Sequence, residues 1–222
     1  MKRPRFAYLR LGETPAHHDN GVLYCDPLTS LVAYPSFEAH LVQMLPVFAG
    51  TGLHVAIGDV DGLREYVSVQ RSSDPASFGH LAGNACMRII GRVTTRWAES
   101  ELADTVFQLC GTFGGDEVIA AASGISHELF ADRIRGLCQA IKVAAPRPCS
   151  FALATLEADG VTPDGAADAY RCLVSMVDAR LFQEKEQARR NGHGLDGFVT
   201  DLGIVDLHER AGRASGATGG RH

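Results

Sequence analysis

Residues Thr105 to Ala122 read TVFQLCGTF, then GG, then DEVIAAA, and they carry the clearest local pattern in the chain. The two arms of this stretch are apolar runs typical of β-strands, and they are joined by Gly114 and Gly115. Two successive glycines tolerate the positive φ angles that a tight turn between antiparallel strands requires. The stretch therefore predicts a β-hairpin whose second strand opens on Asp116 and Glu117.

Strand-like and helix-like patterns alternate on both sides of this hairpin. For the last helix, Thr162 is the expected N-cap and Pro163 the expected first helical residue. The alternation predicts an α/β or α+β domain rather than a helix bundle or a β-sandwich. The spacing of apolar residues predicts helices at 36–48, 76–98, 126–142 and 163–190, and strands at 53–59 and 149–155.

The composition is that of an ordinary globular protein. The chain has 222 residues, with 21 Lys and Arg against 26 Asp and Glu, and no basic block offers a nucleic-acid surface. No stretch approaches the roughly 20 apolar residues of a membrane span, and the N-terminus lacks the apolar core of a signal peptide. We therefore expect a cytoplasmic protein that binds neither nucleic acid nor a membrane. The six cysteines form no C-x-x-C pair and are expected to be buried free thiols.

The two ends of the chain differ from its middle. Residues 1–21 are polar and are interpreted as an N-terminal lead-in, and residues 22–192 as the functional domain. Residues 193–222 form a C-terminal extension whose Gly-rich end is expected to be disordered. Within this extension, a short apolar segment at 196–210 is expected to pack on the domain or on a second subunit.

Acidic residues stand where two of the predicted strands would meet. Asp59 and Asp61 lie at the end of the strand 53–59, and Asp116 and Glu117 open the second arm of the hairpin. If the two strands are neighbours, Asp59 converges with Asp116 and Glu117 at one end of the sheet. Carboxylates at close quarters either hold a divalent cation or share protons, and ligands that are all oxygen favour Mg²⁺ or Mn²⁺ over Zn²⁺. Taken singly, each pair is also compatible with an ordinary solvated turn.

The long helix predicted at 163–190 carries two cationic side chains, Lys185 and Arg189, at the end of its apolar face. The ammonium of Lys185 and the guanidinium of Arg189 could reach the phosphates of a nucleotide. Alone they would be a solvated helix end stabilised by the helix dipole, but with the carboxylates they indicate phosphoryl or nucleotidyl transfer. The apolar stripe and its continuation at four-residue steps consist of Tyr170, Leu173, Val174, Val177, Leu181, Lys185 and Arg189.

Several short motifs resemble those of GGDEF domains, the diguanylate cyclases. The string Gly114 to Val118, GGDEV, is similar to the signature itself, with Val in place of the final Phe. The other motifs follow the family's order and spacing over about residues 26–190. They are Asp26–Leu31 for D-x-L-T-G-L, Asp59–Asp61 for D-x-D, Gly79–Gly83 for G-H-x-x-G-D, Ser150 for the S-x-G strand, and Asp178–Lys185 for the closing A-D-x-A-L-Y-x-A-K.

The resemblance implies a palm-like, nucleotide-cyclase-like α+β fold, in which helices flank a central and mostly antiparallel sheet. It implies that Asp59 and Asp116 are catalytic residues that hold Mg²⁺ or Mn²⁺, with help from the Val60 carbonyl. Glu117 would be a further metal ligand or would take part in activating the 3′-hydroxyl.

The resemblance also implies a bound nucleoside triphosphate in each subunit. Because each 3′-hydroxyl would attack the α-phosphate on the partner, the active enzyme would be a homodimer that makes a cyclic dinucleotide. The nucleotide-binding residues implied are Gly62, Leu63, Arg64, Val67, Asn84, Gly114, Gly115, Lys185 and Arg189.

Two positions at which the family reads guanine differ in this chain. The family's Asn after D-x-D is Val67 here, and the Asp of G-H-x-x-G-D is Asn84. Valine makes no hydrogen bond to a base, and a lost polar contact costs on the order of 1 to 3 kcal/mol. The expected substrate is therefore GTP or another nucleoside triphosphate, with base specificity altered from guanine. The alternatives are a catalytically silent GGDEF-like module that binds a nucleotide or a protein, and a purely structural dimerisation module.

Overall fold

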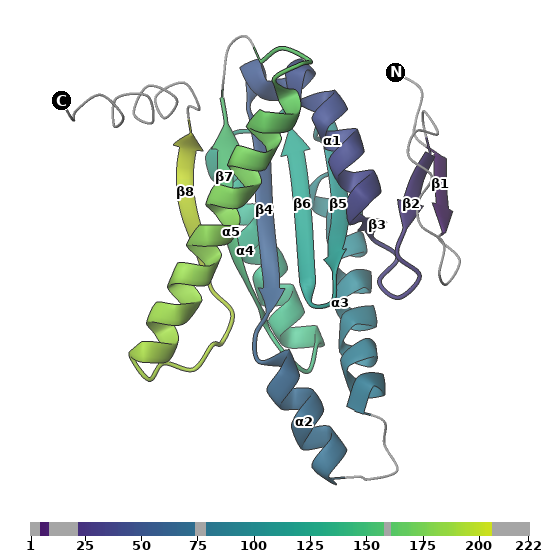
Figure 1. The fold of residues 1–222 in the computed structure, drawn as a ribbon, viewed down its shortest axis with the longest axis vertical. Helices are drawn as coiled ribbons and strands as arrows, with labels where there is room; N and C mark the ends of the chain where they lie inside the picture. Colours follow the sequence, from purple (N-terminus) through teal and green to yellow (C-terminus); the bar gives the residue numbers. More distant parts are fainter. Residues whose placement is uncertain (1–4, 9–21, 74–78, 158–160, 206–222) are drawn as a thin grey trace, which may run out of the picture.

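The computed structural model describes residues 5–8, 22–73, 79–157 and 161–205 of the chain. Figure 1 shows one sheet with helices against it. In chain order the elements are β1 (Arg5–Tyr8), β2 (Val22–Cys25), β3 (Val32–Ala33), α1 (Tyr34–Phe48), the 3-10 turn η1 (Ala49–Thr51), β4 (Leu53–Val60), α2 (Leu63–Ser73), α3 (Gly79–Glu101), β5 (Phe107–Gly114), β6 (Glu117–Ser123), α4 (His127–Ala144), β7 (Cys149–Leu156), α5 (Ala166–Arg190) and β8 (Val199–Val205).

The strands lie in the order β1-β2-β3-β5-β6-β4-β7-β8. The four central strands, β5, β6, β4 and β7, are antiparallel to one another. Among the described strands, the parallel pairs lie toward the edges of the sheet, between β1 and β2, β3 and β5, and β7 and β8. The predicted α+β fold with a mostly antiparallel central sheet is thus confirmed.

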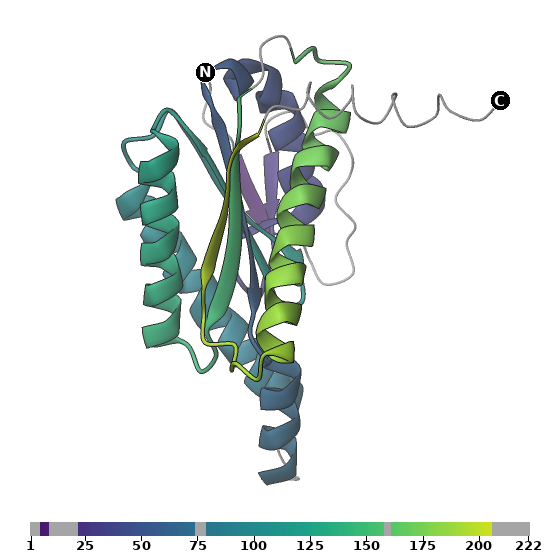
Figure 2. The same cartoon turned by 90° about the vertical axis from the view of Figure 1, so that its left-hand side faces the viewer.

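Helices cover both faces of the sheet, so each face has its own apolar core (Figure 2). On one face, Phe37 of α1 and Leu173 of α5 pack on strand residues such as Ile57. On the other face, Ile90 of α3 and Phe130 of α4 pack on the opposite sides of the same strands. The stripe predicted along α5 is buried, and its burial extends to Lys185, of which only 4% is exposed.

The predicted hairpin is present, but its turn lies one residue further along the chain. Strand β5 runs through Gly114, which pairs with Glu117, so Gly115 and Asp116 form the link instead of the two glycines. Both glycines nevertheless have positive φ, +99° and +70°. The Thr112 hydroxyl donates to the Glu117 carbonyl at 2.8 Å and accepts from the Gly114 amide at 3.1 Å, which extends the pairing up to the turn.

The long helix begins later than predicted. Helix α5 starts at Ala166, with Gly165 as its N-cap, so Pro163 is not a helical residue. Thr162 instead starts a turn in which its carbonyl accepts from the Gly165 amide at 3.1 Å. Because this turn satisfies the Thr162 carbonyl locally, the helix is initiated only after the turn closes.

Six elements were not predicted: the helix α2, the 3-10 turn η1, and the strands β1, β2, β3 and β8. Strand β1 falls within the predicted lead-in, and β8 within the predicted C-terminal extension. The rest of the lead-in and residues 206–222, with the predicted disordered end, lie outside the described residues.

The apolar segment of the extension packs on its own domain as β8, parallel to β7. Beside it, His127 Nε2 of α4 lies 3.0 Å from Asp201 Oδ2, and the β7–β8 register shifts where Gly203 has φ +76°.

The cysteines are free thiols, as predicted. Cys25, Cys86, Cys138 and Cys149 are buried, whereas Cys110 and Cys172 are half-buried. Burial raises the pKa of the Cys138 thiol to about 11 and that of Cys110 to about 12. Since the thiolate is the reactive form, these two thiols are poor nucleophiles at neutral pH.

Candidate functional site

The carboxylates predicted to converge lie together at one end of the sheet. Strand β4 is the neighbour of β6, and Asp59 is paired in register with Glu117. The Val60 amide donates to the Asp116 carbonyl at 3.0 Å, which fixes the hairpin turn against the end of β4. The hairpin geometry is therefore what places Asp116 and Glu117 beside Asp59.

These residues open into a cavity of about 390 Å³ between the strand ends, the start of α2 and the last turns of α5. The residues that line it are those expected at the metal and the triphosphate, together with four others. The predicted ones are Asp59, Val60, Gly62, Leu63, Arg64, Asp116, Glu117, Lys185 and Arg189, and the additional ones are Glu65, Asp178, Leu181 and Phe182.

Four of the predicted nucleotide-binding residues, all in the described part of the chain, do not line this cavity: Gly114, Gly115, Val67 and Asn84. The two glycines are exposed at the hairpin tip. Val67 of α2 and Asn84 of α3 are half-buried on two helices that pack together, where a Cβ on Gly83 would lie 3.1 Å from the Val67 side chain. Figure 1 shows α2 extending away from the sheet beyond the end of β4. Val67 and Asn84 are therefore placed away from the carboxylates, along the α2–α3 pair.

The carboxylates of the site disfavour one another's ionisation. Burial, followed by the charges of Asp59, Asp116 and Asp178, raises the pKa of Glu117. Burial also raises the pKa of Asp59, against the opposing effect of Lys185. A cluster of this kind is stabilised by added positive charge.

The donor set fits a hard divalent cation. Every side-chain donor of the predicted metal site is a carboxylate oxygen, and the Val60 carbonyl is a further oxygen. Oxygen ligands suit Mg²⁺ or Mn²⁺. The described residues contain no group of three or more His, Cys, Asp or Glu side chains already arranged around a metal position.

Lys185, which the resemblance implied at the triphosphate, lines the same cavity and has its ammonium engaged by a carboxylate there. Its ammonium forms an ion pair with the Asp59 carboxylate and also donates to the Asp59 carbonyl at 2.8 Å. A second carboxylate, that of Asp61, lies 2.7 Å away. Lys185 is thus an internal counter-ion of the carboxylate cluster. Arg189, by contrast, is exposed at the mouth of the cavity, with Glu186 at 2.8 Å as its partner.

The start of α2 provides backbone donors toward the same cavity. Gly62 has φ +63°, and a Cβ there would lie 2.5 Å from a terminal nitrogen of Arg147. Arg147 Nε donates to the Asp61 carbonyl at 2.7 Å, so this contact holds the turn before the helix in place. The first amides of a helix bind phosphate groups well because they lack intrahelical partners.

Asp61, Asp178 and Arg147 received no role from the sequence. Asp178 stands seven residues before Lys185 on α5, and that spacing places both on one helix face. Asp61 was part of the D-x-D motif, and its burial, at 0% exposure, marks it as different from Asp59. No comparable spacing identified Arg147, because its contact with the Asp61 carbonyl depends on the path of the chain just before β7.

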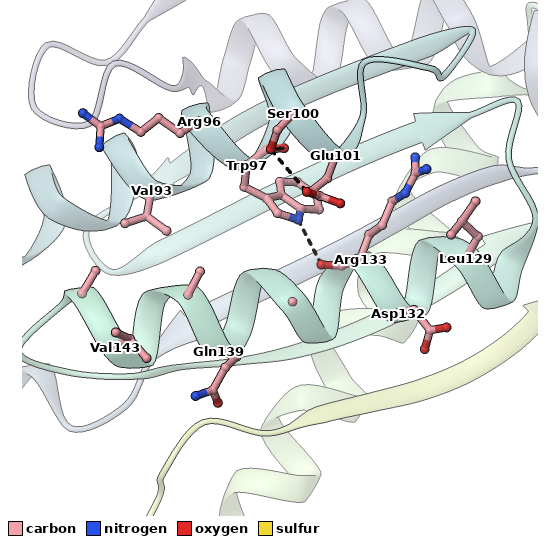
Figure 3. Close-up of a pocket in the computed structure, with 13 residues that line it drawn as sticks. Val93, Arg96, Trp97, Ser100, Glu101, Leu129, Asp132, Arg133, Gln139 and Val143 are labelled. Atoms are coloured by element: carbon pink, nitrogen blue, oxygen red, sulfur yellow. Dashed lines mark hydrogen bonds between the residues drawn. The ribbon is translucent and has the colours of Figure 1, made fainter.

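A second and larger cavity, of about 890 Å³, lies between α3 and α4 (Figure 3). Trp97 lines this cavity and donates from Nε1 to the Arg133 carbonyl at 3.0 Å. None of the carboxylates or cations of the first cavity lines this one. The carboxylates and cations of the first cavity are therefore separate from this second cavity.

The raised pKa values make a prediction about pH. Protons compete with a cation for Asp59 and Glu117, whose ordinary pKa values are 3.8 and 4.5 and are raised in the folded protein. As the pH is lowered, Mn²⁺ affinity should therefore begin to fall at a pH higher than the range in which unperturbed Asp and Glu side chains titrate. Titration calorimetry with Mn²⁺ at a series of pH values measures this. Glu117→Gln should move the onset to lower pH, and an unchanged profile would contradict the assignment.

Comparison with known proteins identifies the fold. No protein-family model matches the chain, and no curated protein matches it. Among solved structures, the GGDEF domain of DgcB from Caulobacter crescentus in complex with c-di-GMP is similar, with TM-score 0.58 and 17% identity over 80% of this chain and 94% of that one. The diguanylate cyclase SiaD of Pseudomonas aeruginosa, in complex with its activator SiaC, has TM-score 0.57 and 20% identity over 82% of this chain and 61% of that one.

The GGDEF domain of FimX from Pseudomonas aeruginosa is similar too, with TM-score 0.51 and 16% identity over 79% of this chain and 98% of that one. The chain therefore has the GGDEF domain fold, as the motifs had indicated. No helix in the described ranges combines the length and the apolar character that crossing a membrane requires.

Proposed function

We propose that this protein is a nucleotidyltransferase that condenses two nucleoside triphosphates into a cyclic dinucleotide. One observation carries the proposal: a single cavity contains Asp59, Asp116 and Glu117 together with the start of α2. Carboxylates for a cation and helix amides for phosphates are the two requirements of phosphoryl-type transfer. The similarity of the fold to DgcB and SiaD supports this reaction over other uses of the same groups.

In the proposed reaction, each 3′-hydroxyl oxygen forms a bond to the α-phosphorus of the other nucleotide, and the bond from that phosphorus to pyrophosphate breaks, so two phosphodiester bonds form and two pyrophosphates leave. The hydroxyl proton leaves to a carboxylate or to water, and Glu117 is suited to accept it because its pKa is raised. Bound Mg²⁺ or Mn²⁺, held by Asp59, Asp116 and the Val60 carbonyl, would supply charge stabilisation at the phosphates.

Phosphate binding falls to groups at the cavity mouth. The amides of Gly62 and Leu63 begin α2, and Arg64 and Arg189 are exposed beside them. Because one cavity holds one nucleotide, the two nucleotides come from two subunits, and we propose that the active form is a homodimer. The chain's formal net charge of −5 gives no attraction for nucleic acid as an alternative substrate.

The test is an incubation of the purified protein with Mg²⁺ or Mn²⁺ and each labelled nucleoside triphosphate, singly and in pairs. Products are separated by chromatography and identified by mass. A cyclic dinucleotide would support the proposal and would name its bases. Metal-dependent nucleotide binding without any product would instead support a silent regulatory module, which the pairing of Lys185 with Asp59 and Asp61 favours, since that pairing neutralises the site internally.

Base choice makes a separate prediction. Val67→Asn combined with Asn84→Asp should raise kcat/KM for GTP relative to the other triphosphates by about thirtyfold or more, because two restored polar contacts of about 1 to 3 kcal/mol each contribute at least about 2 kcal/mol. Competition assays with pairs of triphosphates measure the ratio. Val69→Asn is the matched control, since Val69 lies on the same helix and is 62% exposed. An unchanged ratio in the double variant would show that the base binds elsewhere.

A further inference from the structure

Two histidines, one threonine and one aspartate form a continuous hydrogen-bonded network between the interior and β8. His54 of β4 has Nε2 at 2.9 Å from the Ile125 carbonyl and Nδ1 at 2.6 Å from Thr155 Oγ1. His127 of α4 has Nδ1 at 2.7 Å from the same hydroxyl and Nε2 at 3.0 Å from Asp201 Oδ2. We call these four side chains the histidine network. Because Thr155 is 0% exposed, no substrate reaches its hydroxyl, and the Asp–His–Thr order is not that of a working hydrolase triad.

The number of protons in the histidine network follows from its four hydrogen bonds. Each bond needs one proton between its two heavy atoms. Neutral His54, Thr155 and His127 supply one proton each, which makes three. The Ile125 carbonyl and the Asp201 carboxylate, at the two ends, are acceptors and supply none. The network therefore holds one proton more than its neutral imidazoles and hydroxyl provide.

The surroundings assign this extra proton to His127. Burial lowers the pKa of His54, which is only 1% exposed and stacks on Phe130, so His54 stays neutral. The side chain of Asp201 is 29% exposed, so solvent hydrates its carboxylate, and its Oδ1 accepts from the Gly203 amide at 2.8 Å. His127 lies between the two with both ring nitrogens directed at oxygen atoms. It is therefore an imidazolium that donates from both nitrogens.

Two more carboxylates lie near the histidine network, and both are exposed. Glu128 follows His127 at the start of α4. The positive end of the helix opposes a proton on His127, and the charge of Glu128 offsets this effect. Glu157 follows β7, and its Oε1 lies 3.6 Å from the place of a Cβ on Gly52, which also faces His54. The ring nitrogens of both histidines are already engaged within the network, so these two carboxylates act on it through their charge alone.

We propose that the histidine network is a pH-sensitive contact that docks β8: a proton on His127 binds the Asp201 carboxylate of β8 to the body of the domain. Without this proton, a lone pair of Nε2 would face the carboxylate and the hydrogen bond would be lost. Figure 1 shows β8 at the edge of the sheet, where one such contact affects its docking. The inference does not depend on the proposed function, because His54 and Asp59 lie at opposite ends of β4.

The sign of the pH dependence follows from proton linkage. The docked network takes up a proton, which the histidine of an undocked chain holds only below a pH of about 6.5. The stabilisation is therefore complete below that pH. It is lost as the pH rises through the range in which the docked network gives up its proton.

Asp201→Asn tests the proton count without removing a hydrogen bond. The asparagine amide can donate to Nε2, so four bonds are complete with neutral rings. We measure unfolding of the full-length chain by chemical denaturation from pH 5.5 to 8.5. The unfolding constant of Asp201→Asn divided by that of the wild type should fall about tenfold over this range, in line with one hydrogen bond to a charged group. A constant ratio would overturn the proposal.

Asp196→Asn is the matched control. Asp196 also joins the segment before β8 to α4, but its partner is Lys142, at 2.6 Å, which keeps its charge throughout this pH range. Its ratio of unfolding constants to the wild type should be the same at every pH. A fall equal to that of Asp201→Asn would show a general effect of charge, and would overturn the proposal.

Two further measurements locate the proton and the strand. Nitrogen-15 NMR of the imidazole rings at pH 7 should show both nitrogens of His127 protonated in the wild type and mainly Nδ1 in Asp201→Asn, with His54 protonated at Nε2 alone in both. An extra proton on His54 instead would overturn the assignment. From pH 6 to 8.5, hydrogen exchange of the β8 amides, corrected for the intrinsic effect of pH, should speed up relative to that of β6 in the wild type only. Unchanged relative exchange would overturn the role in docking.

Discussion

Asp116→Ala should lower the rate of cyclic dinucleotide formation by about a thousandfold or more, because cation-assisted charge stabilisation is worth several kcal/mol and each 1.36 kcal/mol is tenfold in rate. Asp116 lies in the hairpin turn, and its carbonyl, which the substitution keeps, accepts the Val60 amide. The fold should therefore persist. Removal of its charge also relieves the repulsion that raises the pKa of Asp59 and Glu117.

The measurement pairs product formation, followed by chromatography, with a thermal melt. Asp132→Ala is the matched control, since Asp132 is an exposed aspartate of α4 whose partner is Arg135. The control should keep both its activity and its melting temperature. Normal turnover in Asp116→Ala would remove Asp116 from the cation site. A strongly lowered melting temperature would show that the loss of activity results from loss of folding instead.

Gly58→Ala should destabilise the protein by about 2 kcal/mol, although it adds a single methyl group. A Cβ at Gly58 would lie 2.4 Å from a ring carbon of Phe151, on the neighbouring strand β7, and both residues are buried. The Phe151 ring occupies the space that a side chain at Gly58 would take, so either the ring or one of the two strands must shift in the variant. For a chain of this length the melting temperature should fall by about 6 °C.

Two further variants make the test specific. Gly136→Ala is the control, because nothing lies within 4 Å of the place that a Cβ would take there on α4, and the better helix propensity of alanine should raise stability by about 0.5 to 1 kcal/mol. The double variant Gly58→Ala/Phe151→Leu should lose less stability than the sum of the losses in the two single variants, since leucine is smaller than phenylalanine and leaves room for the alanine methyl group. Strict additivity in chemical denaturation would show that the ring is not the cause.

The parts of the fold predicted from sequence are those with a strong pattern of their own. Strands β4, β6 and β7 are continuous buried apolar runs, and the hairpin has its glycines. Strand β3 has only two residues, which is too short for any period to be recognised. Helix α2 was missed because most of its residues are polar, although the few apolar ones are spaced for one helix face.

The candidate site divides in the same way. The convergence of Asp59, Asp116 and Glu117 follows from strand ends and turn position, which the sequence displays. The contact of Lys185 with Asp61 depends on where α5 crosses the end of β4, and no local pattern specifies that crossing. The base-reading positions Val67 and Asn84 were aligned by motif, but how they sit on the α2–α3 pair follows from helix packing.

Strand β8 also has a consequence for the behaviour of the chain in solution. Every residue of β7 is buried, and its sequence, CSFALATL, is uncharged and apolar enough to pair with other chains if its edge were free. Strand β8 pairs with that edge of β7 and becomes the edge strand itself, and its own edge is less suited to pairing with another chain. The carboxylate of Asp201 and the irregular backbone at Gly203 interrupt the regular edge that a foreign strand would need. The segment therefore protects the molecule from edge-to-edge aggregation.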